Sequence, residues 1–208
     1  MRLLLGLLLS LAPVAAFATG PVVGNSSFET PVLSPGGYVY DPTGASWLFT
    51  ASSGISANGA GGFNFSNTPN GVQVAFLQTF GANGGVISQT VTGLTSGSTY
   101  NISFTAALRT GFVADPVTVS FGGSVLGVFS PTTTTFTTLT TPNFVAGGTS
   151  GLLSFAAQAS SSSDIDTGID AVSFTLVSNA TTPVPEPISL ALLATGLVGL
   201  GYARRKSV

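Results

Sequence analysis

The chain of 208 residues contains no cysteine and no histidine. Without cysteine it forms no disulfides and no thiolate metal sites. Without histidine it lacks the usual general base, the Ser-His-Asp triad and imidazole-ligated zinc or iron. A domain of this length still buries enough apolar surface to fold without covalent cross-links. Carboxylates are therefore the main titratable side chains available for chemistry.

Charged residues are also scarce, at 6% of the sequence against about 25% in an average protein. Residues 19–183 contain a single cation, Arg109. Their net charge is −5, because they also contain six anions: Glu29, Asp41, Asp115, Asp164, Asp166 and Asp170. Nucleic-acid binding needs Lys and Arg to replace phosphate counterions, so this composition excludes it.

The first 18 residues, Met1 to Ala18, have the pattern of a signal peptide. Arg2 supplies a positive n-region, Leu3 to Leu11 form an apolar segment, and Ala16-Phe17-Ala18 fits the small-x-small cleavage rule. We therefore expect a signal helix over residues 1–18 and a mature chain that starts at Thr19. The alternative is an uncleaved anchor, but the apolar segment is short for a membrane span of about 20 residues.

The other end of the chain combines three features in order. Pro185-Glu186-Pro187 precedes an apolar run from Ile188 to Ala203, and Arg204-Arg205-Lys206 follows that run. The run approaches the length needed to cross a bilayer, which predicts a transmembrane helix over residues 188–203. A basic cluster after the helix stays in the cytoplasm, so the preceding domain lies on the outer side of the membrane. A plain C-terminal anchor would also explain this pattern.

This order resembles the PEP-CTERM sorting signal of Gram-negative bacteria. The resemblance covers residues 185–208 and implies two partners, the export machinery and an exosortase, a membrane-embedded transpeptidase. The exosortase would cut near Pro185-Glu186-Pro187 and pass the domain to the cell surface or the extracellular matrix. Such systems accompany exopolysaccharide production. In that case the tail is a substrate, and the catalysis belongs to another protein.

Residues 19–178 are predicted to form one β-domain, followed by a linker over residues 179–184. The clearest strand is Thr99 to Arg109, where Tyr100, Ile102 and Phe104 alternate with polar residues. Further strands are expected at Val72–Gln78, Val86–Val91, Val117–Phe121, Val125–Phe129, Thr134–Leu139, Leu152–Gln158 and Ile169–Val177. Short β-rich runs separated by Gly, Asn, Ser and Pro predict an antiparallel two-sheet sandwich of about eight or nine strands.

Three segments of this domain resemble galactose-binding-like jelly-roll domains. They are Asn25-Ser26-Ser27-Phe28-Glu29, Ile87-Ser88-Gln89-Thr90-Val91 and Ile169-Asp170-Ala171-Val172-Ser173-Phe174. The chain departs from the usual pattern at Ser26, where a glycine is common, and at Ala171, where an asparagine is common. The resemblance implies an all-β jelly roll with relatives among carbohydrate-binding modules, and it does not fix a ligand.

Asp170 is the candidate metal ligand. In a regular strand it shares a face with Val172 and Phe174, so it faces the core if they do, and a buried carboxylate needs a partner. The resemblance implies a structural Ca²⁺ held between Glu29 and Asp170, with backbone carbonyls completing the ligand shell. Alternatively, Asp170 caps backbone N–H groups at the mouth of the strand.

Four residues are candidates for binding sugar, because sugars are held by aromatic planes and polar side chains. They are Tyr38, Tyr40, Trp47 and Arg109. The alternatives are a core role for Trp47, loop packing for the two tyrosines and a surface ion pair for Arg109.

No local motif singles out a catalytic pair among the six acidic residues, so we expect no enzyme activity. The sequence favours an exported surface or matrix protein whose sandwich binds polysaccharide without transforming it. The alternative is a purely structural biofilm or matrix protein that acts through protein contacts.

We expect the exported protein to begin at Thr19 and to end near Pro185-Glu186-Pro187, because both ends are removed during export and sorting. N-terminal sequencing and the intact mass of protein from the producing cells test this. A chain that begins at Met1, or that keeps residues 188–208 in a host with active exosortase, would contradict it.

Overall fold

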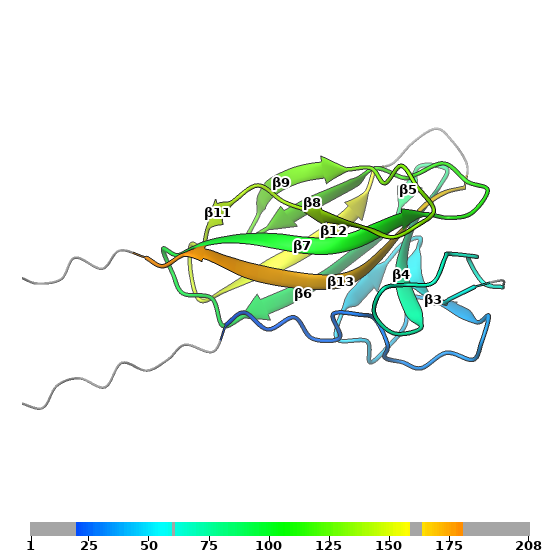
Figure 1. Cartoon of the computed structure of the whole chain (residues 1–208), viewed down its shortest axis with the longest axis horizontal. Helices are drawn as coiled ribbons and strands as arrows, with labels where there is room; N and C mark the ends of the chain where they lie inside the picture. The colour runs from blue at the N-terminus through cyan, green and yellow to red at the C-terminus, as the bar shows by residue number, and fades with distance from the viewer. Residues whose placement is uncertain (1–19, 60, 159–163, 181–208) are drawn as a thin grey trace, which may run out of the picture.

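The structure is a computed structural model that describes residues 20–59, 61–158 and 164–180 (Figure 1). These residues form strands, turns and loops and contain no helix. The strands are β1 (Tyr38–Tyr40), β2 (Leu48–Thr50), β3 (Ser53–Ala57), β4 (Gln73–Phe80), β5 (Asn83–Gly84), β6 (Val86–Thr92), β7 (Thr99–Leu108), β8 (Val117–Phe121), β9 (Ser124–Phe129), β10 (Thr137–Thr140), β11 (Phe144–Val145), β12 (Ser150–Ala157) and β13 (Ile165–Ser178).

The strands form two antiparallel sheets packed face to face. The larger sheet has the order β1-β3-β4-β13-β7-β10, with β5 paired to β4 and β11 paired to β7. The smaller sheet has the order β2-β6-β12-β8-β9. This arrangement confirms the predicted all-β antiparallel sandwich of the jelly-roll kind. The additional short strands are β1, β2, β3, β5 and β11, which carry no alternating run long enough to be recognised in the sequence.

The main core lies between the two sheets and follows from period-two alternation. In β7, Tyr100, Ile102, Phe104 and Ala106 are buried in this core, as predicted. Phe104 meets Phe155 of the smaller sheet edge to face, with ring centroids 5.0 Å apart. The two sheets are thus joined through aromatic contacts.

A second, smaller core lies on the outer face of the larger sheet. It consists of the buried residues Phe63, Phe65, Val74 and Phe76, with Phe136 packed against them. Val74 and Phe76 alternate along β4 with Ala75 and Leu77, which belong to the main core. The segment between β3 and β4 therefore folds back over the sheet, and its two phenylalanines cover the outer face.

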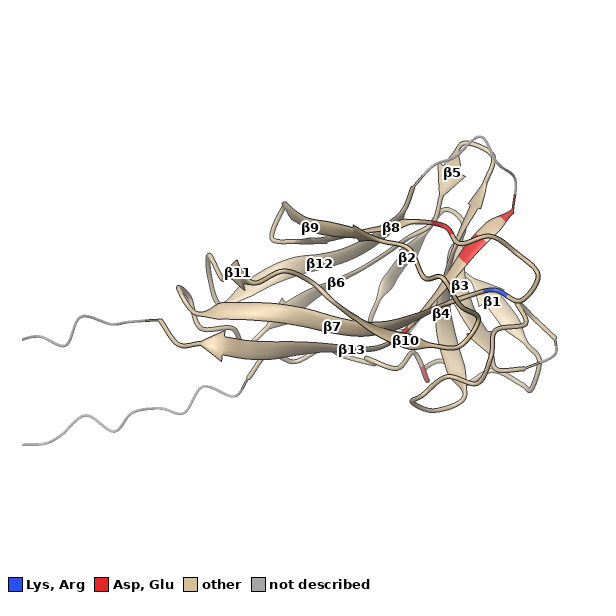
Figure 2. Cartoon of the chain, turned by 45° about the horizontal axis from the view of Figure 1, so that its top comes forward, with Lys and Arg blue, Asp and Glu red and all other residues tan. Residues whose placement is uncertain are grey.

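The charged residues are distributed unevenly along the sandwich. In Figure 2 the coloured acidic and basic positions lie toward the end that contains β1, β3 and β5. The opposite end, where β11 lies and where the described chain begins and stops, shows none. The two ends of the domain therefore offer different surfaces to partners.

The predicted signal helix and the predicted transmembrane helix both fall outside the described residues. Within the part of the chain that the structure describes, no helix has the length and apolar character needed to cross a membrane. Strand β13 ends at Ser178, next to the predicted linker.

Gly54 in β3 should tolerate no side chain. A Cβ at this position would lie within van der Waals overlap of the Val39 carbonyl oxygen and 2.6 Å from the Phe76 ring. We expect Gly54→Ala to lower the free energy of unfolding by about 1–3 kcal/mol, because β1 or Phe76 must move. Urea denaturation of the exported protein measures this. Gly20→Ala is the control, since nothing lies within 4 Å of a Cβ there, and equal stability of the two variants would contradict the packing.

Candidate functional site

Tyr38 and Tyr40 point outward from β1, an edge strand of the larger sheet. Val39 between them packs against the main core. The two rings meet Phe63 nearly edge to face, with centroid distances of 5.3 Å and 5.8 Å. Tyr38 is 54% exposed and Tyr40 is 40% exposed. The pair forms an aromatic surface that Phe63 supports from beneath.

Arg109 follows β7 and extends the outward-facing row of that strand. Its guanidinium lies 4.5 Å from the Phe63 ring centroid and 3.9 Å from that of Phe112, which favours cation–π attraction. Its Nη1 also forms ion pairs with Asp166 Oδ2 at 3.0 Å and Asp164 Oδ1 at 3.5 Å. The structure thus brings Arg109, Tyr38 and Tyr40 together around one ring.

A hydrogen-bonded chain joins these groups. The Tyr40 hydroxyl donates to Gln78 Oε1 at 2.6 Å. The Gln78 side-chain amide in turn donates to Asp164 Oδ1, which is paired with Arg109. Burial raises the pKa of Tyr40, and the nearby Asp166 adds to this, so the phenol stays protonated as a donor. The polar atoms of the site are therefore held in place before any ligand arrives.

A shallow cavity of about 370 Å³ opens beside this chain of contacts. Its walls are formed by Tyr40, Gln78, Asp164, Phe80 and the backbone turn at residues 51–52. Phe80 is 63% exposed, an unusual position for a large apolar side chain. An exposed aromatic beside fixed hydroxyl, amide and carboxylate groups is suited to binding a sugar ring.

Trp47 lies elsewhere. It is 5% exposed, packs against Phe28 with ring centroids 5.2 Å apart, and donates from Nε1 to the Asn25 carbonyl oxygen at 3.1 Å. It is a core residue, and it offers no free ring face to a ligand. The candidate sugar site therefore does not include Trp47.

Asp170 is buried, but its surroundings differ from those expected from strand alternation. A β-bulge lies between Asp170 and Ser173, and Ala171 has a φ of 51°. The bulge reverses the alternation, so Val172 enters the main core while Asp170 pairs with Thr105 on the outer face. The prediction that Asp170 and Val172 share a face of the strand is therefore wrong.

Asp170 lies near enough to Glu29 for the charge of Glu29 to act on it. Glu29 Oε1 accepts hydrogen bonds from the backbone amides of Val72 and Gln73, at 2.9 Å and 2.8 Å. Asp170 Oδ1 accepts one from the Ala171 amide at 2.7 Å, whereas the buried Oδ2 receives none. Burial, helped by the charge of Glu29, raises the pKa of Asp170 to about 7, although hydrogen bonds from the Ala171 and Asn70 amides act in the opposite direction.

The carboxylates of Asp170 and Glu29 and the Thr68 hydroxyl are oxygen groups of the kind that Ca²⁺ binds. Besides Glu29, the Thr68 hydroxyl and the Asn70 backbone amide lie against the carboxyl group of Asp170, and the amide, as a hydrogen-bond donor, cannot be a ligand for a cation. Among the described residues no three acidic side chains gather as a metal site. A cation here would need neutral oxygens to complete a shell of six to eight ligands.

Two further buried carboxyl groups were not singled out by the sequence. Asp166 is fully buried and paired with Arg109, and Asp115 is fully buried with no hydrogen bond to either carboxyl oxygen. Burial raises the pKa of Asp115 and that of Asp166 to about 6. Thr79 acts in the opposite direction on Asp115, and Arg109 does so on Asp166. Nothing in the sequence marks either residue as buried, and around Asp166 every residue from Ile165 to Asp170 is buried, so the segment shows no alternation.

Residues 183–206 match the family model of the PEP-CTERM protein-sorting motif. This motif indicates an exported protein that an exosortase processes. No curated protein matches the sequence.

Several solved structures share the fold. A cyclase from Fischerella sp. TAU has a TM-score of 0.58 and 19% identity, over 77% of this chain and 98% of the cyclase. The K2 cleaved adhesin domain of Lys-gingipain has a TM-score of 0.51 and 12% identity, over 72% of this chain and 97% of that domain. The CBM22-1 xylan-binding domain from Paenibacillus barcinonensis has a TM-score of 0.45 and 15% identity, over 69% of this chain and 94% of that domain. The structures similar to this chain thus include carbohydrate-binding modules and a cyclase, and these low identities concern the fold alone.

Asp115 should destabilise the protein when it is ionised. Its raised pKa means that the folded state holds its proton more tightly than the unfolded state, so stability falls as the pH rises from about 4 through about 6. We expect Asp115→Asn to raise the melting temperature by a few degrees at pH 8 and to leave it unchanged at pH 4. Calorimetry at both pH values tests this, and the same shift at both would show that ionisation is not the cause.

Proposed function

We propose that this protein acts at the cell surface or in the extracellular matrix, where its β-sandwich binds polysaccharide without transforming it. The observation that carries the proposal is the group of exposed rings, Tyr38, Tyr40 and Phe80, beside a fixed network of polar side chains. Rings of this kind stack on the apolar faces of sugars, and the network supplies hydrogen bonds that orient them.

The charge of the site favours a neutral polysaccharide. Arg109 is surrounded by Asp164 and Asp166, and the anions outnumber the cation. A uronic acid or a sulfated sugar would meet Asp164, whose side chain is 37% exposed. The hydroxyls of a neutral sugar would instead donate to that carboxylate.

The arrangement of the carboxyl groups supports binding rather than catalysis. Asp166 is fully buried behind Arg109, and Asp164 is held by Gln78 and Arg109. A glycosidase needs two carboxyl groups that reach the scissile bond from either side. Neither of these groups is free to approach a substrate in that way.

The sorting tail accounts for the location of the domain. Before processing, residues 188–203 would hold the protein in the inner membrane, with Arg204, Arg205 and Lys206 on the cytoplasmic side. The exosortase would then cut near Pro185-Glu186-Pro187 and release the domain on the outer side of a Gram-negative cell. The predicted signal peptide directs the chain into this export route.

A structural Ca²⁺ is part of the proposal. Glu29 and Asp170 would hold it, with the Thr68 hydroxyl and backbone carbonyl oxygens among the remaining ligands. The buried and unpaired Oδ2 of Asp170 supports this assignment. The ion would fix the segment between β3 and β4 to the last strand, and that segment carries Phe63.

A structural matrix role is the second candidate. Strand β9 lies at the edge of the smaller sheet and contains no charged residue. Val125 and Val128 on this strand are 67% and 53% exposed. An uncharged edge with exposed valines is suited to pairing with another β-chain, which would support assembly without any glycan.

Tyr40→Ala should weaken glycan binding by about tenfold, which corresponds to the loss of one aromatic contact of about 1.4 kcal/mol. Affinity electrophoresis and calorimetry of the exported protein against neutral and acidic polysaccharides measure this. Leu48→Ala is the control, because Leu48 is 64% exposed on the smaller sheet.

Repeating the titration with Ca²⁺ and then with a chelator tests whether the protein holds a structural Ca²⁺. We expect the chelator to lower the melting temperature and to weaken binding, and Glu29→Gln to abolish both responses. Failure of every polysaccharide to bind would remove the proposal and leave the matrix role. Binding that the chelator does not change would remove only the calcium site.

A further inference from the structure

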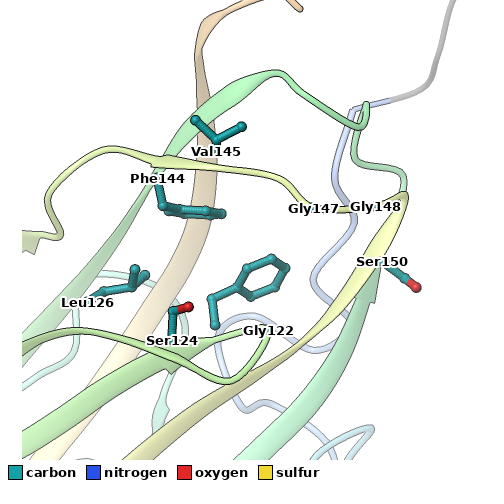
Figure 3. A pocket seen from close by; sticks show the side chains of 9 residues that line it. Gly122, Ser124, Leu126, Phe144, Val145, Gly147, Gly148 and Ser150 are labelled. Carbon is teal, nitrogen blue, oxygen red and sulfur yellow. The ribbon is translucent and has the colours of Figure 1, made fainter.

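A second concave site lies at the other end of the sandwich, between the edge strands β9 and β11 (Figure 3). It is a cavity of about 360 Å³ within the range of about 300–1,000 Å³ that is typical of small-molecule sites. Its walls include Phe121, Ser124, Leu126, Phe144, Gly147 and Gly148. β11 pairs with the first residues of β7, and Arg109 follows the last, so the two sites are about 30 Å apart along this ten-residue strand.

The pocket has a rigid aromatic side. The rings of Phe121 and Phe144 have centroids 5.0 Å apart and are tilted by 44°. Phe174 of β13 supports both, at 5.3 Å from Phe121 and 6.2 Å from Phe144. These contacts fix the ring orientations before a ligand binds, which reduces the entropic cost of binding.

The remaining walls are polar but uncharged. Ser124 contributes a hydroxyl, and Gly122, Gly147 and Gly148 bring backbone without side chains to the wall. The Gly122 amide already donates to the Leu152 carbonyl oxygen at 3.0 Å. No charged residue lines the pocket, and the charged residues of the described chain lie toward the opposite end (Figure 2). A ligand with one apolar face and a rim of neutral hydroxyls fits this combination, whereas an acyl chain would leave the polar groups unsatisfied.

Gly147 is one of the residues that line this pocket. A Cβ at this position would meet no atom within 4 Å, so a larger side chain is accommodated there without displacing the fold. The backbone of Gly147 lies outside the left-handed region, so the substitution causes no strain. Because Gly147 forms part of the pocket wall, we expect a side chain at this residue to reduce the space in the pocket without disturbing the fold.

We propose that this pocket is a second carbohydrate site, which takes one neutral pyranose ring against Phe144. Phe121, which is 7% exposed, belongs to the main core and holds the Phe144 ring in place. The proposal rests on the proposed function only for the class of ligand, a neutral polysaccharide. With one site at each end of the sandwich, a single molecule binds two sugar chains and links them. The protein then acts as a cross-linker of the polymer rather than as a passive coating.

The test is amide chemical-shift mapping of the exported protein with neutral gluco-, galacto- and manno-oligosaccharides. We expect shifts at Gly122, Gly147 and Gly148 with at least one of these sugars, and none with oligogalacturonate. Gly147→Leu should weaken this response at least about tenfold, and Ser124→Ala should weaken it by a smaller factor. Gly20→Leu is the matched control, since a Cβ at Gly20 also meets nothing within 4 Å.

The outcomes separate this proposal from the previous one. Shifts around Gly147 without shifts around Tyr40 would support the pocket and remove the site at Tyr40. Shifts around Tyr40 alone would overturn the pocket and leave the proposed function intact. No shifts at either place, or shifts around Gly147 that survive Gly147→Leu, would overturn the pocket. Aggregation of the polysaccharide by the native protein, lost in Gly147→Leu and kept in Gly20→Leu, would support cross-linking.

Discussion

The stacking of Phe63 on Phe76 is the contact on which the candidate site depends. The two rings lie nearly parallel, with centroids 3.8 Å apart, and they bind the segment between β3 and β4 to the outer face of the larger sheet. Phe63 in turn contacts the rings of Tyr38 and Tyr40 nearly edge to face, and the guanidinium of Arg109 lies over its ring. Without this contact the sheet would present a flat outer face and no group of oriented side chains.

Much of the architecture follows from local sequence, because the longer strands alternate apolar and polar residues and end at glycine-rich turns. β7 is the clearest case, with its inward residues in the core. The short strands cannot be predicted from the local sequence. All five residues of β3, Ser53–Ala57, are buried, because one face meets the main core and the other meets the second core. A strand covered on both sides shows no alternation, and only long-range packing reveals it.

The residues of the candidate site could be predicted from the sequence only in part. Arg109, Tyr38 and Tyr40 are rare residue types in this chain, and their chemistry drew attention to them before their proximity was known. Their partners Gln78 and Asp166 face each other across β4 and β13, which requires the strand order. The error at Asp170 has a single cause, since the bulge at Ala171 shifts the alternation by one residue. No local signal in the sequence marks that bulge.

The caged position of Arg109 has a consequence for the life of the protein outside the cell. Proteases of trypsin-like specificity cut after lysine or arginine, and residues 19–183 offer them one such residue. Its side chain is 17% exposed, lies between two phenylalanine rings and is paired with two carboxylates. The folded domain thus offers this class of secreted protease almost no accessible cleavage site. The contacts around Arg109 that shape the candidate sugar site therefore also protect the domain from proteolysis outside the cell.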